Sequence, residues 1–436
     1  MNGKPPESAS PPAAIAEAMG HIYRRGMTTI SGGNISVRDD DGDIWITPAQ
    51  IDKGNLRPDD IVRVTADGRV AGRHAASSEY PAHRRIFQVR DDLRAIIHAH
   101  PAGLVAFSIC HKTPDTAILP EVHDLCGPVG YATYERSGSE ALGRQVAAAF
   151  AGECRCVVLE NHGVMIGDLD LRQALARFEA LEQTARTIIG AAALGPIHCL
   201  SAVELDRARA SAATLAECEA PSPADREEAL RREICQFARR GYRQSLTISG
   251  GGGLSARLDG RTFIITARDV GWRMVEADDL VLVEGRSCPA GRRPDRAVLL
   301  HEAIYRRHPR VMAIVTAAAP NTSAFSVTGA HLDSRVTGEG YFFLGDVATI
   351  SFDAFHGRAD HLAATVGPDR PAWLVENEGA LVLGTSVLGA YDRLEVLEST
   401  AEALIGSRRV GGPVPLTPRA IEELGGPSSP HRLGRP

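Results

Sequence analysis

Thr29-Ile30-Ser31-Gly32-Gly33 recurs further along the chain as Thr247-Ile248-Ser249-Gly250-Gly251. Glu160-Asn161-His162-Gly163 recurs in the same way as Glu376-Asn377-Glu378-Gly379. These matches keep one order and nearly one offset, about 216–219 residues, which is the signature of a duplicated unit. The sequence therefore predicts two tandem copies of one fold.

The register of the repeat predicts where each copy begins and ends. Copy one is expected at residues 11–215 and copy two at residues 226–409. The residues between them, 216–225, are polar and contain proline, which is typical of a linker. The first ten residues and the tail at 410–436 are rich in Pro, Gly and Ser, so we expect them to be loose at least in part.

The composition narrows the class of protein. The 436 residues are 44% hydrophobic and 23% charged, so each half can bury a core of its own. The net charge of −6 and the lack of a separate basic segment argue against nucleic acid as a partner. No apolar run reaches 18 residues and the N-terminus lacks a signal-peptide core, so we expect no membrane partner. The eight cysteines contain no CxxC pair, and a cytoplasmic location is expected.

Strand-like and helix-like segments are interleaved in copy one, which is typical of a mixed α/β domain with helices covering a sheet. Helices are expected at residues 14–25, 80–89, 139–151 and 171–194, and strands at 34–37, 44–47, 61–64, 94–98 and 155–159.

Three histidines and one glutamate are placed at the ends of such elements. His98 and His100 end a strand, where residues i and i+2 project from one face and can reach a single ion. Taken alone, this pair is more often two ordinary polar histidines at a strand end than a metal site. His162 follows a second apolar strand, and Glu79 begins a helix. Three imidazoles and a carboxylate make a plausible Zn²⁺-type set with room for substrate oxygens.

Two further segments could bind an anion. The turn from Ser31 to Asn34 can offer backbone N–H groups and a side-chain amide. Ser77 and Ser78 precede a helix, where hydroxyls and N–H groups attract anions. The alternative is a tight turn and an ordinary serine N-cap.

Five motifs in copy one together resemble the class II aldolase/adducin family, which includes L-fuculose-phosphate aldolase, L-ribulose-phosphate 4-epimerase and several decarboxylases. The resemblance implies two tandem α/β/α domains, each with a mixed, largely antiparallel central sheet. The motifs are Ser31-Gly-Gly-Asn34-Ile-Ser36, Ile46-Thr47-Pro48, Ser77-Ser78-Glu79, His98-Ala-His100-Pro101 and Asn161-His162-Gly163-Val164.

The resemblance also implies roles. His98, His100 and His162 would bind a divalent metal, Zn²⁺ first and otherwise Mn²⁺, Co²⁺ or Fe²⁺. Glu79 would be the acid/base of a lyase that breaks a carbon–carbon bond in a small hydroxy-carbonyl or sugar-phosphate-like substrate through a metal-stabilised enediolate. Contacts to a substrate phosphate or carboxylate would come from Gly33, Asn34, Ser77 and Ser78.

One departure from the family leaves the reaction open. Family aldolases carry a Tyr on the loop after the HxHP motif and epimerases an Asp, and the nearest counterpart here is Asp124. Epimerases, however, carry Asp where this chain has Glu79. Decarboxylation of a hydroxylated acid uses the same kind of carbanion and competes with aldol cleavage. A non-heme iron oxygenase and a non-catalytic, adducin-like assembly module are further alternatives.

Copy two has lost the candidate metal set. The repeat places Thr316, Ala318 and Glu378 at the positions of the three histidines, and Ala297 at the position of Glu79. We therefore expect no catalytic metal there. The family's C4-like tetramers imply that a tandem chain could dimerise into a pseudo-tetramer.

Overall fold

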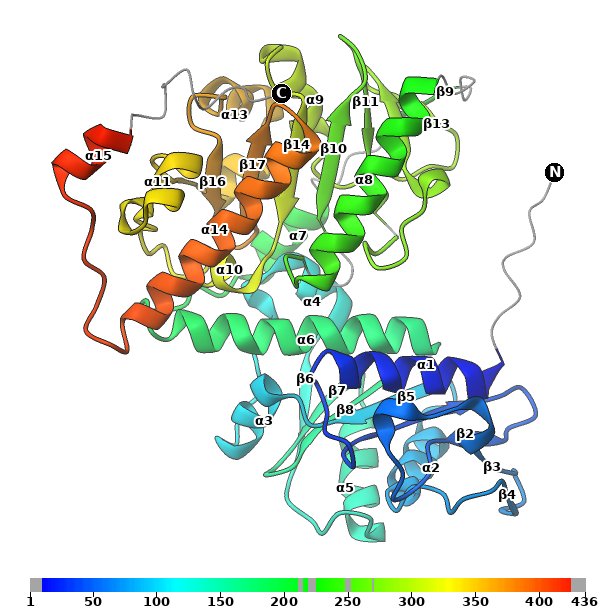
Figure 1. The fold of residues 1–436 in the computed structure, drawn as a ribbon. Helices are drawn as coiled ribbons and strands as arrows, with labels where there is room; N and C mark the ends of the chain where they lie inside the picture. The colour runs from blue at the N-terminus through cyan, green and yellow to red at the C-terminus, as the bar shows by residue number, and fades with distance from the viewer. Residues whose placement is uncertain (1–9, 211–214, 219–224, 248–251, 269, 425–436) are drawn as a thin grey trace. The chain divides into compact units, whose positions relative to one another are not determined.

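The computed structural model describes residues 10–210, 215–218, 225–247, 252–268 and 270–424 (Figure 1). They form two compact units, one of Met1–Thr116 with His123–Ala185 and one of Ala117–Val122 with Arg186–Pro436. Part of the repeated glycine motif, residues 248–251, lies outside the described residues. No helix among the described residues is long and apolar enough to cross a bilayer.

The first unit is built on an eight-stranded sheet in the order β4-β3-β2-β1-β5-β8-β7-β6. Neighbouring strands are antiparallel except β6 and β7, which are parallel. The prediction of a mixed, largely antiparallel sheet is therefore confirmed. The strands are β1 (Asn34–Arg38), β2 (Ile44–Ile46), β3 (Val62–Val64), β4 (Val70–Ala71), β5 (Ala95–Ala99), β6 (Val129–Ala132), β7 (Cys156–Leu159) and β8 (Gly163–Asp168).

Helices α2 (Tyr80–Val89) and α5 (Glu140–Phe150) pack against one face of this sheet (Figure 1). Their buried Ile86 and Phe150 meet sheet residues such as Ile96 in one apolar core. Helix α1 (Pro11–Arg24) packs beside β1 and β2, with Ile15, Met19 and Ile22 buried at the spacing of one helical stripe. The remaining helices are α3 (Ala102–Ile109), α4 (Pro120–Cys126) and α6 (Leu171–Ala191).

The second sheet repeats the first strand for strand and adds one strand at its edge. Its order is β15-β16-β17-β14-β10-β11-β12-β13-β9. Strand β14 (Ala313–Ala317) corresponds to β5, β17 (Gly379–Gly384) to β8, and α9 (Val298–Arg307) to α2. The other strands of this sheet are β9 (Ala216–Cys218), β10 (Gly253–Arg257), β11 (Thr262–Ile265), β12 (Val281–Glu284), β13 (Ser287–Pro289), β15 (Ala348–Ile350) and β16 (Ala372–Val375). Further helices of this part of the chain are α8 (Asp225–Arg243), α13 (Ala359–Thr365), α14 (Val387–Ser407) and α15 (Pro418–Leu424).

Two segments differ from the sequence-based expectation. Residues Ala216–Cys218, placed in the linker, form β9 because their backbone pairs in parallel with β13 at the sheet edge. In the expected loose tail, Pro418–Leu424 form helix α15, whereas residues 425–436 and 1–9 lie outside the described residues. Strands β4, β6 and β8 and helices α3 and α4 were not expected, since runs of two to eight residues carry little periodicity.

Asp168, at the end of β8, should be essential to the stability of the first unit. Its buried carboxylate contacts Arg155 at 2.7 Å and Arg177 at 2.7 Å. Asp168→Asn removes a charge that two guanidinium groups need, and such losses cost about 3–5 kcal/mol. We expect the midpoint temperature of thermal unfolding of the first unit to fall clearly. Asp67→Asn, in an exposed pair with Arg69, should leave that temperature unchanged. Equal melting curves for the two variants would contradict this.

Candidate functional site

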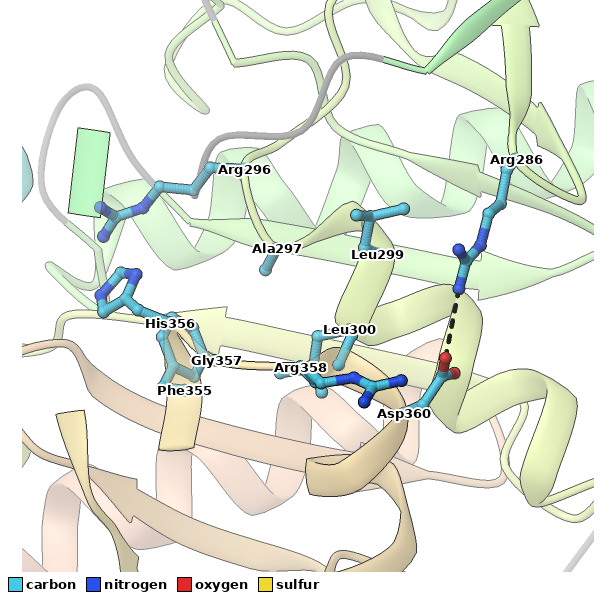
Figure 2. Close-up of a pocket in the computed structure, with 11 residues that line it drawn as sticks. Arg286, Arg296, Ala297, Leu299, Leu300, Phe355, His356, Gly357, Arg358 and Asp360 are labelled. Atoms are coloured by element: carbon cyan, nitrogen blue, oxygen red, sulfur yellow. Dashed lines mark ion pairs between the residues drawn. The ribbon is translucent and has the colours of Figure 1, made fainter. Parts of the chain in front are cut away.

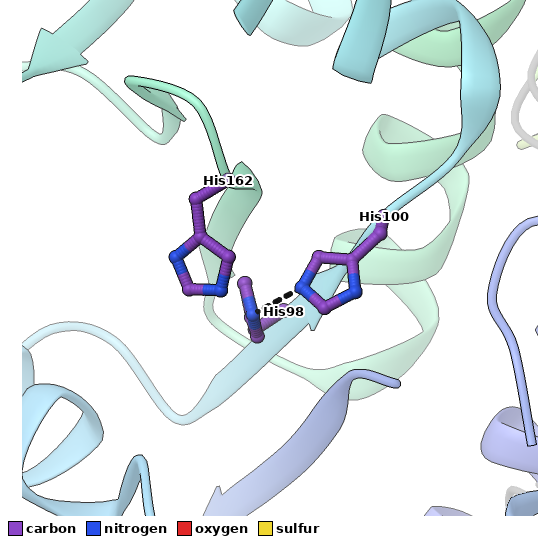
Figure 3. Close-up of side chains that lie close together, drawn as sticks. All are labelled: His98, His100 and His162. Atoms are coloured by element: carbon purple, nitrogen blue, oxygen red, sulfur yellow. Dashed lines mark hydrogen bonds between the residues drawn. The ribbon is translucent and has the colours of Figure 1, made fainter. Parts of the chain in front are cut away.

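Three imidazoles converge in the first unit (Figure 3). The Nε2 atoms of His98 and His100 lie 3.0 Å apart. The rings of these two residues and of His162 have centroids 4.7–5.0 Å from one another. One nitrogen from each ring lies within 4.8 Å of a nitrogen of each of the other two rings. This is the spacing of a three-ligand metal site. The sequence-predicted ligand set is thus brought together in space.

Strand register and one tight turn place these rings. His98 lies on β5 directly opposite Asn34 of β1, and His100 follows two residues later on the same face. His162 is in the turn between β7 and β8, where Asn161 adopts a left-handed φ of 51°. A Cβ at Gly163 would come within 2.6 Å of the carbonyl oxygen of Ala99 and of the His100 ring, so only glycine fits.

Hydrogen bonds to the rings suit a metal ligand set. The Nδ1–H of His98 donates to the Val164 carbonyl at 3.0 Å, which leaves Nε2 directed at the other rings. Such a backbone partner is the usual way of fixing the tautomer of a ligating histidine. The Nδ1 of His162 is buried and has no partner among the described residues. The residues present therefore fit a divalent cation.

Glu79 adjoins the histidines from the start of α2. Its carboxylate lies 2.9 Å from Nε2 of His98 and 3.3 Å from Nε2 of His162, and it accepts a hydrogen bond of 2.8 Å from the Asn34 amide. Burial acts to raise the pKa of this carboxyl, but the charge and hydrogen bond of His98 and the bond from Asn34 together hold the pKa well below its usual value. Glu79 is therefore an ionised base.

The three imidazoles differ in protonation. Burial, together with the neighbouring rings, lowers the pKa of His100 to about 3 and that of His162 to about 4. Burial also acts to lower the pKa of His98, but the Glu79 carboxylate outweighs it and raises that pKa above its usual value. Near neutral pH the rings of His100 and His162 are neutral, whereas Glu79 favours the protonated form of His98, and a cation would have to displace that proton.

A buried hydrogen-bond chain supports Glu79 from behind, and sequence reasoning missed it. Ser36 Oγ bonds Nδ1 of His83 at 2.7 Å, and Nε2–H of His83 donates to Oδ1 of Asn34. The amide of Asn34 then donates to Glu79. Burial lowers the pKa of His83 to about 3, so this ring is neutral and donates through one nitrogen only. The available signal was the spacing: His83 is one helical turn after Glu79.

Of the remaining sequence-predicted residues, Gly33 and Ser77 contact the site, while Ser78 and Asp124 are exposed. Gly33 has a φ of 71°, and a Cβ there would lie 2.7 Å from the His98 carbonyl oxygen, so glycine lets this turn approach the site. Ser77 is buried and its hydroxyl accepts from the Glu79 amide at 3.3 Å, while Ser78 is exposed. Asp124 is exposed on α4, and its acid–base role stays a prediction.

Comparison with known families matches both halves of the chain to the same family. The family described as "Class II Aldolase and Adducin N-terminal domain" matches residues 13–189 and again residues 232–405. Together these two segments make up well over half of the 436 residues.

Individual relatives are similar to one half of the chain. An L-fuculose phosphate aldolase of Methanocaldococcus jannaschii is 33% identical over 165 residues, which cover 38% of this chain and 88% of the relative. A 3-oxo-tetronate 4-phosphate decarboxylase of Cupriavidus necator is 31% identical over 170 residues, covering 38% and 77%. Among solved structures, an L-fuculose 1-phosphate aldolase is 28% identical with a TM-score of 0.43, covering 46% of this chain and 94% of its own.

Cation binding at the three histidines should release a proton below neutral pH. The Glu79 carboxylate raises the pKa of His98, so a cation competes with the proton on that ring, and the cation affinity should fall about tenfold for each pH unit below this raised pKa. His100 and His162 are already neutral from about pH 5 upward and add no further dependence. Calorimetric titration with Co²⁺ in buffers of different ionisation enthalpy measures the released proton. A Co²⁺ affinity that stays constant from about pH 5.5 to 8 would exclude this coupling.

Proposed function

This chain belongs to the class II aldolase and adducin family, and on that premise we propose that its first copy is a divalent-metal-dependent carbon–carbon lyase. The observation that carries the proposal is the direct contact of Glu79 with His98 and His162. The base, Glu79, thus lies directly beside the histidines that would hold the cation. Proton transfer next to a stabilised carbanion requires this arrangement. Zn²⁺ is the cation we propose first, with Mn²⁺, Co²⁺ and Fe²⁺ as alternatives.

The residues of this chain would divide the work as follows. A divalent cation held by His98, His100 and His162 would supply Lewis-acid charge for the negative charge that develops on a substrate oxygen. The ionised Glu79 accepts the proton of the substrate hydroxyl that becomes a carbonyl as the carbon–carbon bond breaks. The electron pair of that bond stays on the other fragment, and Glu79 returns the proton to its carbon, so charge and atoms balance. Asn34 holds the carboxylate in place through both steps.

The substrate we propose is a small phosphorylated hydroxy-carbonyl compound, cleaved by a retro-aldol step. Both relatives named above act, by their names, on a phosphorylated sugar or sugar acid. Ser77 and Ser78 at the start of α2, with the turn at Gly33 and Asn34, would contact the phosphate. Decarboxylation of a phosphorylated oxo acid is the second candidate, because one relative is a decarboxylase.

Assembly and location belong to the same proposal. The family resemblance favours a dimer of tandem chains that forms a pseudo-tetramer, in a cytoplasmic protein that works on a free small molecule.

Metal content and two product assays test this function. Protein purified without chelator should carry about one divalent ion per chain, and His98→Ala should lose it. Glu79→Gln should keep the ion and lose about 10²–10⁴-fold in kcat.

L-fuculose 1-phosphate, assayed for its two three-carbon products, probes aldol cleavage, while CO₂ release from 3-oxo-tetronate 4-phosphate probes decarboxylation.

Three outcomes would redirect the proposal. Iron as the bound metal, with oxygen uptake, would favour an oxygenase. A chain that binds no cation after supplementation would be a non-catalytic assembly module. Full activity of Glu79→Gln would remove this residue from the proton transfer.

His83 should act on catalysis through Asn34, as a positioning residue. His83→Ala frees the Asn34 amide, so Glu79 loses a hydrogen bond and its pKa rises. We expect kcat to fall about 10–100-fold with KM nearly unchanged, and the acidic limb of the pH–rate profile to move to higher pH. His83→Gln, which can still donate to Asn34, should recover part of the rate.

Copy two provides the matched control for this prediction. His301 occupies the equivalent position on α9 and bonds Ser255 at 2.8 Å as His83 bonds Ser36. Glycine stands where copy one has Asn34, and Nε2 of His301 is buried with no hydrogen-bond partner among the described residues. His301→Ala should leave the pH–rate profile unchanged. A shift of the profile in both variants alike would mean that the effect is only a general loss of stability.

A further inference from the structure

Helix α4 has a counterpart in copy two, α11 (Gly338–Leu344), at the same offset that relates β5 to β14. Each of the two helices carries a glutamate as its second residue, Glu121 in α4 and Glu339 in α11. Glu339 is exposed, whereas Glu121 lines a cavity of the second unit. The duplicated fold thus places the same side chain in two different environments.

The segment Ala117–Val122, which contains the first turn of α4, belongs to the second unit. The buried Asn377 donates from its side-chain amide to the carbonyl oxygen of Ile118 at 2.8 Å. The backbone amide of Leu200 donates to the carbonyl oxygen of Ala117 at 2.9 Å. Copy two therefore holds the backbone on which Glu121 is carried.

The cavity that Glu121 lines is too small to hydrate a carboxylate. Its volume is about 20 Å³, and a single water molecule needs roughly 10–15 Å³. The lining includes the three residues at the positions of the copy-one histidines, which are Thr316, Ala318 and Glu378. Glu121 thus enters the part of copy two that corresponds to the candidate metal site of copy one.

A larger cavity of about 300 Å³ adjoins the first and is shown in Figure 2. Arg296, Ala297 and Phe355 line both cavities, so these side chains stand between them. Water in the larger cavity would reach the Glu121 carboxyl only if these side chains or the start of α4 moved. An ionised Glu121 therefore lacks hydration as long as the start of α4 stays in place.

Two buried carboxylates adjoin the small cavity and disfavour a charge on Glu121. Asp295 and Glu378 both line it, and Glu378 forms an ion pair with Arg296. Among the described residues, no hydrogen bond or ion pair reaches the Glu121 carboxyl. Loss of hydration raises the pKa of Glu121 to about 7, against the attraction of Arg296 and with the repulsion of the two carboxylates. The charged and titratable groups that face this carboxyl or contact its neighbours are Arg268, Asp295, Arg296, Glu378 and His356, together with His123 and Asp124 on α4 itself.

We propose that Glu121 is a proton-controlled latch that holds the first turn of α4 in copy two. With its proton, the neutral carboxyl stays in the small cavity and the segment Ala117–Val122 stays in place. When the proton passes to solvent, the carboxylate leaves the cavity for water and the segment is released. The latch concerns the position of α4 and does not depend on the lyase function.

The direction of the pH dependence follows from the two states of the latch. In the released segment Glu121 has an ordinary carboxyl pKa of about 4.3, which is lower than its pKa in the cavity. The held state binds the proton more tightly and is fully favoured below about pH 4. Its equilibrium constant over the released state should fall about tenfold for each pH unit from about 4.5 to 7 and stay constant above that.

Hydrogen exchange of the full-length protein, read by mass spectrometry on a peptide that spans residues 117–126, tests this latch. Opening equilibria, corrected for the chemical exchange rate at each pH, should rise about tenfold per unit between about pH 5 and 7. Glu121→Gln is neutral at every pH and nearly the same shape, so its opening should not depend on pH and should be rarer than in the wild type at pH 7. Glu339→Gln changes the exposed counterpart and should behave as the wild type does.

Three results would overturn the latch. The first is wild-type opening that does not vary between about pH 5 and 7. The second is a pH dependence that persists in Glu121→Gln, which would assign the proton to another group such as Asp295 or His356. The third is an equal loss of the pH dependence in Glu121→Gln and Glu339→Gln, which would reflect the net charge of the chain and not the cavity.

Discussion

The antiparallel pairing of β1 with β5 sets Asn34 directly opposite His98, and the chemistry of the first copy depends on this register. Because side chains alternate between the faces of a strand, a slip of one residue would turn both groups to the other face. In the observed register both point toward α2, where Glu79 and His83 complete the contacts. The glycine at Gly33 allows the preceding turn to pass against the His98 carbonyl.

Charge compensation explains why such a polar group of residues is stable inside the fold. A buried carboxylate is costly unless it is paired and hydrogen-bonded. Glu79 meets this requirement with His98, His162 and Asn34, and either a proton on His98 or a bound cation can supply the positive charge. A cation bound by the three histidines would therefore take the place of the proton on His98. Its neutral members, His100 and His83, owe their low pKa values mainly to burial.

The two copies show what this scaffold keeps when the metal ligands change. The Ser36–His83 bond survives in copy two as the bond between Ser255 and His301, although glycine has replaced the asparagine that His83 serves. Glu378, at the position of His162, contacts Arg296 and His356. The same strand ends thus carry three converging imidazoles in one copy, and in the other a carboxylate that contacts a guanidinium and an imidazole.

The sequence by itself determined the duplication, the α/β class and the identity of the residues that could bind a cation. These follow from local patterns: a repeat at one offset, strand alternation at His98 and His100, and a helix start at Glu79. Only the tertiary structure decided which side chains touch, because strand register and helix packing join residues far apart in the chain. The bond from His83 to Asn34, the strand at Ala216–Cys218 and the cavity beside Arg296 all arise in this way. No local periodicity encodes them, since each depends on the distance between two elements that pack against each other.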